Sequence, residues 1–94
     1  MIHALFVIAN LNGHSVTLEY DPPHAPVPLV IGKNDNAATH ISYAKMCGVP
    51  IFSNPTLAET LYSKVRVGTQ IPYRLYAEIA EYIAALMSEK VSAA

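Results

Sequence analysis

The stretch HALFVIANLNGHSVTLEY, residues 3–20, decides the fold that the sequence predicts. Its first seven residues form a nearly continuous apolar run, which favours a strand buried on both faces. Residues 15–20 alternate apolar and polar side chains, as a half-buried strand does. The pair Asn12-Gly13 lies between them and readily takes the positive φ angles of a type I′ turn. We therefore expect a β-hairpin closed by a two-residue loop.

That loop sets the register we expect in the hairpin. Leu11 would face His14, and the pairs Ala9–Val16, Val7–Leu18 and Leu5–Tyr20 would follow along the two strands. One side of the sheet would then carry a single apolar set: Leu5, Val7, Ala9, Val16, Leu18 and Tyr20. Because side chains alternate between the two faces of a strand, a slip of one residue would send a strand's apolar set to the other face.

A third strand and a first helix are expected after the hairpin. Prolines stiffen residues 21–26, and residues 27–32 then read as a strand. Pro28 cannot donate a hydrogen bond to a sheet, so it belongs at the strand's start or at a sheet edge. Asp35 or Asn36 can cap a helix that runs to about Met46. Gly48 is suited to closing that helix.

A fourth strand and two more helices complete the prediction. Residues 49–52 are apolar, and Asn54-Pro55 is typical of a helix cap followed by the first helical residue. Pro72 begins the last and longest helix. The order βββαβαα predicts an α/β fold, with a small four-stranded mixed sheet of a β-hairpin and a βαβ unit, flanked by helices. The helix between strands three and four should make those strands parallel. We expect one domain, residues 1–94.

Composition excludes several classes of function. The chain is 52% apolar and 14% charged, which is typical of a globular domain. A net charge of −1, with scattered basic residues, argues against nucleic-acid binding. No apolar run approaches the roughly 20 residues that span a bilayer, so we expect a cytoplasmic chain without membrane insertion. The lone cysteine, Cys47, excludes an intramolecular disulfide.

The residue pattern offers no visible enzymatic chemistry. The four histidines lack metal-ligand spacing, so we expect neither a metal nor a cofactor. The serines and threonines match no nucleophile elbow or P-loop. Glu59, Glu78 and Glu81 read as residues on solvated helix faces. Pattern alone names no function.

Several motifs, in order, resemble the C-terminal cytoplasmic domain of the FlhB/YscU family. They are LEYDP at 18–22, GVPI at 48–51, NPTLAETLY at 54–62 and VGTQIPYRLY at 67–76. The members of this family are gate and substrate-switch proteins of type III export. The wording of the motifs is similar to the flagellar branch, and the resemblance covers Leu5 to Leu86. It implies a four-stranded sheet flanked by helices.

The chain departs from the family at one turn. The family cuts itself at Asn-Pro-Thr-His between its first two strands, where this sequence has Asn10, Leu11, Asn12 and Gly13. In the family the Asn side-chain amide attacks its own backbone carbonyl and expels the next residue. Leu11 restores an N–H that proline lacks, and Gly13 replaces a histidine that would assist proton transfer. We therefore expect no enzymatic activity, with residual self-cleavage at Asn10 as an alternative.

The resemblance implies a non-enzymatic interaction module of the flagellar export apparatus. It would dock export substrates or the hook-length regulator, in place of or alongside the gate protein's own domain. We expect a monomer, peripheral at the apparatus on the inner membrane. The residues implied in docking are Val27, Pro28, Ala80 and Ile83, which could instead simply join the core. A repurposed α/β binding domain without an export role is a further alternative.

Overall fold

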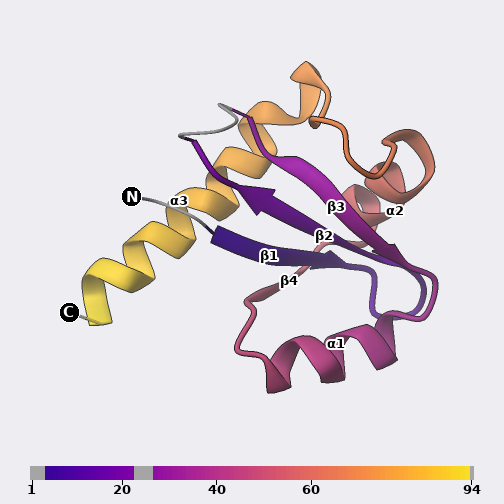
Figure 1. Ribbon diagram of the computed structural model, residues 1–94, viewed down its shortest axis with the longest axis horizontal. Coiled ribbons are helices and arrows are strands. Elements are labelled where there is room, and N and C mark those ends of the chain that lie inside the picture. The colour runs from indigo at the N-terminus through magenta and orange to yellow at the C-terminus, as the bar shows by residue number, and fades with distance from the viewer. Residues whose placement is uncertain (1–3, 23–26, 94) are drawn as a thin grey trace.

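The computed structural model describes the backbone of residues 4–22 and 27–93 (Figure 1). Four strands form one sheet in the order β3-β2-β1-β4. They are β1 (Ala4–Ala9), β2 (Ser15–Tyr20), β3 (Leu29–Asn34) and β4 (Ile51–Ser53). The helices are α1 (Ala37–Met46), α2 (Pro55–Lys64), the short 3-10 helix η1 (Tyr73–Leu75) and α3 (Tyr76–Ala93). The predicted α/β fold and element order are confirmed.

The sheet is mixed. β1 pairs antiparallel with β2, β2 pairs antiparallel with β3, and β4 runs parallel to β1. β3 and β4 therefore point in the same direction, as predicted, but they form opposite edges of the sheet. Pro28 lies directly before the edge strand β3, where its missing N–H costs no ladder hydrogen bond.

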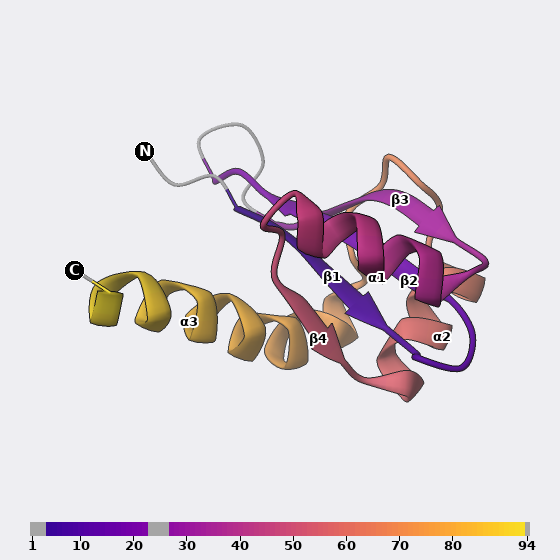
Figure 2. The ribbon, with the colours of Figure 1, turned by 90° about the horizontal axis from the view of Figure 1, so that it is seen from below.

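The helices divide the core into two layers (Figures 1 and 2). α2 and α3 pack on one face of the sheet, where Phe6, Ile8 and Leu18 are buried against Leu57 and Ile79. α1 covers the other face in a smaller cluster, formed by Val7, Ala9 and Ala44. β1 thus has helices on both of its faces, which explains its nearly continuous apolar run.

The predicted hairpin register is wrong by one residue. Ile8 lies opposite Val16, and Phe6 lies opposite Leu18. The Gly13 N–H donates to Asn10 O and the Asn10 N–H donates to His14 O, so the loop is longer than two residues. Gly13 does not have a positive φ, and the type I′ turn is not formed.

This register separates the apolar set that we expected on one side. Val16, Leu18 and Tyr20 face α2 and α3, whereas Val7 and Ala9 face α1. Apolar residues on both faces of β1 suit either register, so the pattern of this strand does not specify its pairing. The bonds of the loop specify it instead.

Local signals place the helices correctly. The Asn36 side chain accepts from Thr39 N–H at the start of α1, and Gly48 follows that helix with φ +73°. Asn54 accepts from Leu57 N–H, and Pro55 is the first residue of α2. The strand bounds are less accurate. β3 begins two residues later than predicted, as does β4, and η1 lies between Pro72 and α3.

Candidate functional site

The four residues implied in docking line one apolar groove. Val27 and Pro28 come from the segment before β3, and Ala80 and Ile83 come from α3. The groove has a volume of about 240 Å³. Its other lining residues are Tyr20, Ile71, Tyr76 and Ile79. No lining residue is charged, so the groove suits apolar side chains.

The groove has a buried floor and a partly open wall. Ile79 and Pro28 are buried, Val27 and Ile83 are half-buried, and Ala80 is exposed. The four predicted residues are therefore neither all exposed nor all in the core.

One wall of the groove is held by backbone hydrogen bonds near β3, and the other wall is one face of α3. The Ile71 N–H donates to Pro28 O, and the Val30 N–H donates to Thr69 O, which fastens residues 69–71 along the edge of β3. The α3 lining residues lie at positions 76, 79, 80 and 83, which is one face of a helix. The sequence did not indicate the other four lining residues, which are Tyr20, Ile71, Tyr76 and Ile79. The helical spacing from Ile83 could have found Tyr76, but nothing local marks Tyr20.

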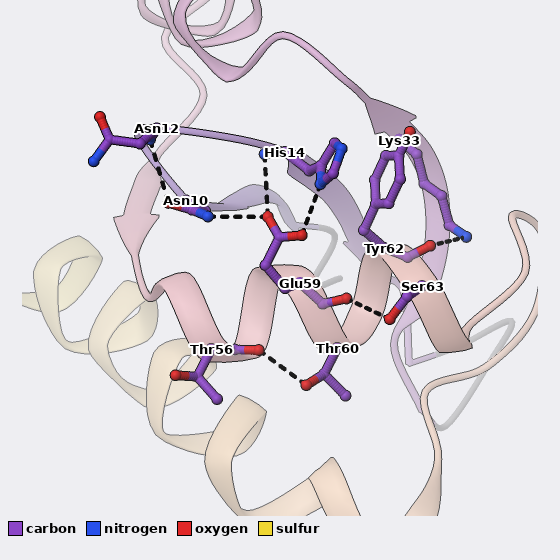
Figure 3. Close-up of polar contacts among 9 residues, drawn as sticks. All are labelled: Asn10, Asn12, His14, Lys33, Thr56, Glu59, Thr60, Tyr62 and Ser63. Carbon is purple, nitrogen blue, oxygen red and sulfur yellow. Dashed lines mark hydrogen bonds and ion pairs between the residues drawn. The ribbon is translucent and has the colours of Figure 1, made fainter.

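The second candidate region is the loop between β1 and β2, which carries the four residues aligned with the family's cleavage turn. Figure 3 draws two of them, Asn10 and Asn12, with their polar contacts. Asn10 Nδ2 donates to Glu59 Oε2 over 3.0 Å, and Asn10 Oδ1 accepts from the Asn12 N–H over 3.2 Å. Both ends of the Asn10 amide are therefore bound. The Gly13 N–H, which could attack the Asn12 side chain in deamidation, is donated to Asn10 O over 2.9 Å.

Glu59 gathers the loop onto α2. Its Oε2 also accepts from the His14 N–H over 3.2 Å, and Oε1 lies 2.7 Å from His14 Nδ1. Hydrogen bonds from His14 first, and then from Asn10, hold the pKa of the Glu59 carboxyl below its ordinary value. The carboxylate is therefore ionised at neutral pH. We call Asn10, Gly13, His14 and Glu59 the hairpin clasp.

Neighbouring side chains support His14. Its ring stacks on Tyr62, with the ring centroids 3.7 Å apart and an interplanar angle of 11°. Lys33 Nζ donates to Tyr62 O over 2.6 Å and lies 5.5 Å from the ring centroid. Glu59 was expected on a solvated helix face; its side chain is 42% exposed, and its hydrogen bonds to the hairpin loop were not expected.

Gly13 makes the clasp possible. A Cβ at this position would lie 2.9 Å from Asn10 Nδ2 and 3.0 Å from Glu59 Oε2. Contacts this short force one of the partners to move. A side chain at position 13 would therefore displace the Asn10 or Glu59 side chain from their shared hydrogen bond.

A third polar contact joins α1 to β2. His40 Nδ1 lies 2.5 Å from Ser15 Oγ, and Nε2 lies 3.1 Å from Thr17 Oγ1. Burial lowers the pKa of His40 below its ordinary value. Within residues 4–22 and 27–93, no three His, Cys, Asp or Glu side chains come together as a metal site. None of the helices described there is both long and apolar enough to span a bilayer.

These features define a small α/β domain with a three-layer arrangement, an apolar groove and a polar hairpin loop. The chain belongs to the FlhB HrpN YscU SpaS family, whose model matches residues 1–86. It is 34% identical over 89 residues to the flagellar biosynthetic protein FlhB of Aquifex aeolicus (strain VF5). That match covers 93% of this chain and 25% of the relative, so the chain spans about a quarter of that protein's length.

Solved structures agree with the family. The cytoplasmic domain of FlhB from Shewanella putrefaciens superposes with a TM-score of 0.78 at 28% identity, covering 86% of this chain and 64% of that one. A mutated EscU C-terminal domain gives a TM-score of 0.81 at 24% identity, covering 87% of this chain and 83% of that one, and shows the shared fold. The resemblance in the sequence is confirmed for both family and fold.

Proposed function

We propose that this chain is a non-enzymatic interaction module of the flagellar type III export apparatus. It binds apolar segments of export substrates or of the hook-length regulator, in place of or alongside the gate protein's own cytoplasmic domain. It acts in the cytoplasm, peripheral to the apparatus at the inner membrane. The observation that carries the proposal is the groove, because it brings Val27 and Pro28 together with Ala80 and Ile83 on an uncharged surface.

The size of the groove suits weak and reversible binding. About 240 Å³ accommodates one or two apolar side chains. Burying each such side chain contributes about 1.5–3 kcal/mol before the cost of association is subtracted. Two such side chains contribute at most about 6 kcal/mol, so we expect the groove alone to bind with affinities of about a millimolar or weaker once that cost is subtracted. Weak binding suits a partner that has to dissociate before it is exported.

The test is an affinity pull-down with this chain as bait from a lysate of flagellated cells. Wild-type bait should enrich hook, rod or ruler proteins, or the membrane gate. Ala80→Asp should remove that enrichment, because it places a charge on the open wall of the groove. Ala77→Asp is the matched control, since Ala77 is exposed on the same helix and does not line the groove. Recovery of none of these proteins by wild-type bait would contradict the export role and favour a repurposed binding domain.

The same proposal includes an uncut hairpin. Leu11 supplies the backbone N–H that a proline would lack, and the histidine position of the family motif is Gly13. The alternative is residual self-cleavage after Asn10. The intact mass of the purified chain distinguishes the two, because two fragments that disappear in Asn10→Ala would establish cleavage.

A further inference from the structure

Asn10 is hydrogen-bonded at four atoms, its backbone N–H to His14 O and three others. Its Nδ2 donates to Glu59, its Oδ1 accepts from the Asn12 N–H, and its backbone oxygen accepts from the Gly13 N–H. The amide group therefore cannot turn about its side-chain bonds without breaking a hydrogen bond. One of those bonds ends on an ionised carboxylate, which makes it stronger than a bond between neutral groups.

Self-cleavage requires this amide to leave its fixed position and come within bonding distance of its own backbone carbon. In that step Nδ2 bonds to the backbone carbonyl carbon of the same residue, and the peptide bond to Leu11 breaks. The proton lost by Nδ2 passes to the departing Leu11 nitrogen. The products are a C-terminal succinimide and a new N-terminal amine, so no other reactant is needed. Nδ2 has to approach its own carbonyl carbon, whereas here it is bound to a carboxylate on α2.

We propose that Glu59 is a positioning residue that withholds the Asn10 amide from this step and keeps the hairpin covalently intact. The inference rests on the proposed uncut hairpin and adds a cause that is independent of Leu11. His14 fixes the carboxylate through its backbone N–H and its ring nitrogen. Gly13 leaves the space in which Asn10 and Glu59 meet, and any larger residue would occupy it.

The test is made in a Leu11→Pro background, which restores an Asn-Pro bond. The Gly13 N–H to Asn10 O bond closes a turn, and Leu11 is its second residue, a position that proline favours. Leu11 is also 56% exposed, so little packing is lost. We expect Leu11→Pro alone to remain largely uncut at neutral pH. Leu11→Pro with Glu59→Ala should be cut after Asn10 about tenfold faster, the effect of losing one hydrogen bond to a charged group.

Intact-mass spectrometry over time measures both rates, and three further variants identify the cause. Adding Asn10→Ala to the double variant should abolish the fragments, because it removes the attacking amide. Leu11→Pro with Thr60→Ala, which alters the same helix outside the clasp, should remain uncut. Leu11→Pro with Glu59→Gln retains an acceptor oxygen and should be cut more slowly than the Glu59→Ala pair.

Equal rates with and without Glu59→Ala would overturn the role of Glu59, whether both variants are cut or neither is. Cleavage of the wild-type chain would instead overturn the proposed uncut hairpin itself. The pull-down with Ala80→Asp reports on docking separately from both. Circular dichroism of each variant verifies that the compared chains are folded.

Discussion

The two ends of β2 have opposite surroundings, one apolar and partly open, the other polar and hydrogen-bonded. At one end Tyr20 lines an apolar groove, one wall of which is open to solvent. The other end lies about 17 Å away for a strand of six residues. There the Glu59 carboxylate accepts hydrogen bonds from the Asn10 side-chain amide and the His14 backbone N–H. Polar groups that are satisfied internally gain little from a partner. We therefore expect partner binding at the groove, and a structural contribution from the hairpin end.

The largest effect on stability is expected at the groove floor, where the prediction tests whether the floor is part of the core while the open wall is not. Ile79 is fully buried and belongs to both the core and the groove. Ile79→Ala should lower the free energy of unfolding by about 2–5 kcal/mol, from lost burial and the cavity left behind. Urea unfolding measures this change. A loss below about 1 kcal/mol would mean that the groove floor contributes little to the core and that the two ends are less different than proposed.

Signals within a few residues predicted much of the fold, whereas contacts between distant residues could not be predicted. Asn36 and Asn54 cap helices through a backbone N–H only three residues away, so the sequence shows both partners. Glu59 binds His14 and Asn10, which lie 45 and 49 positions before it in the sequence. No local pattern distinguishes it from a solvated glutamate. The hairpin register could not be predicted for a different reason: β1 is apolar on both faces, so its pattern suits either register.

The groove illustrates a different limit. The resemblance to the family indicated Val27, Pro28, Ala80 and Ile83, while the apolar pattern alone would equally place them in the core. Their different degrees of exposure depend on how α3 lies against the segment before β3, and that packing is not encoded in any short stretch. The structure adds Tyr20, Ile71, Tyr76 and Ile79 to the groove.

A smaller effect is expected at the hairpin end, where two glycines give a matched pair. At Gly13 a Cβ would meet Asn10 Nδ2 at 2.9 Å, whereas at Gly32 the nearest atom is Thr17 Cβ at 3.8 Å. Gly13→Ala should therefore displace the Asn10 amide from Glu59 and raise the pKa of Glu59 toward its ordinary value. Gly32→Ala should leave that pKa unchanged.

Side-chain NMR titration of Glu59 measures the pKa in both glycine variants. The pKa of Glu59 is lower in the folded chain than in the unfolded one. Glu59 therefore stabilises the fold at pH values above its ordinary pKa, and this contribution is lost as the pH falls through the lowered pKa. Gly13→Ala should weaken this dependence, while Gly32→Ala should not. Equal behaviour of the two variants would show that Gly13 is not coupled to the clasp.

The smallest effect is expected from His40, and it sharpens the comparison by its pH window. Burial lowers the pKa of His40, so the unfolded chain takes up a proton more readily than the folded one. Stability should be complete above the ordinary histidine pKa and should decline as the pH falls from there through the lowered value. The two ring nitrogens of His40 are hydrogen-bonded to the Ser15 and Thr17 hydroxyls. Protonation removes the only acceptor nitrogen of the ring, so the hydroxyl that donates to it loses that bond.

Urea unfolding across that pH range, in wild type and His40→Asn, isolates the contribution of His40. The decline should be shallower in the variant, and it should lie at higher pH than the decline due to Glu59. Because His40 contacts the hairpin end of β2, partner binding in the groove should hardly change over the same range while the chain remains folded. A binding affinity that falls in step with His40 protonation would show that the two ends of the strand are coupled after all.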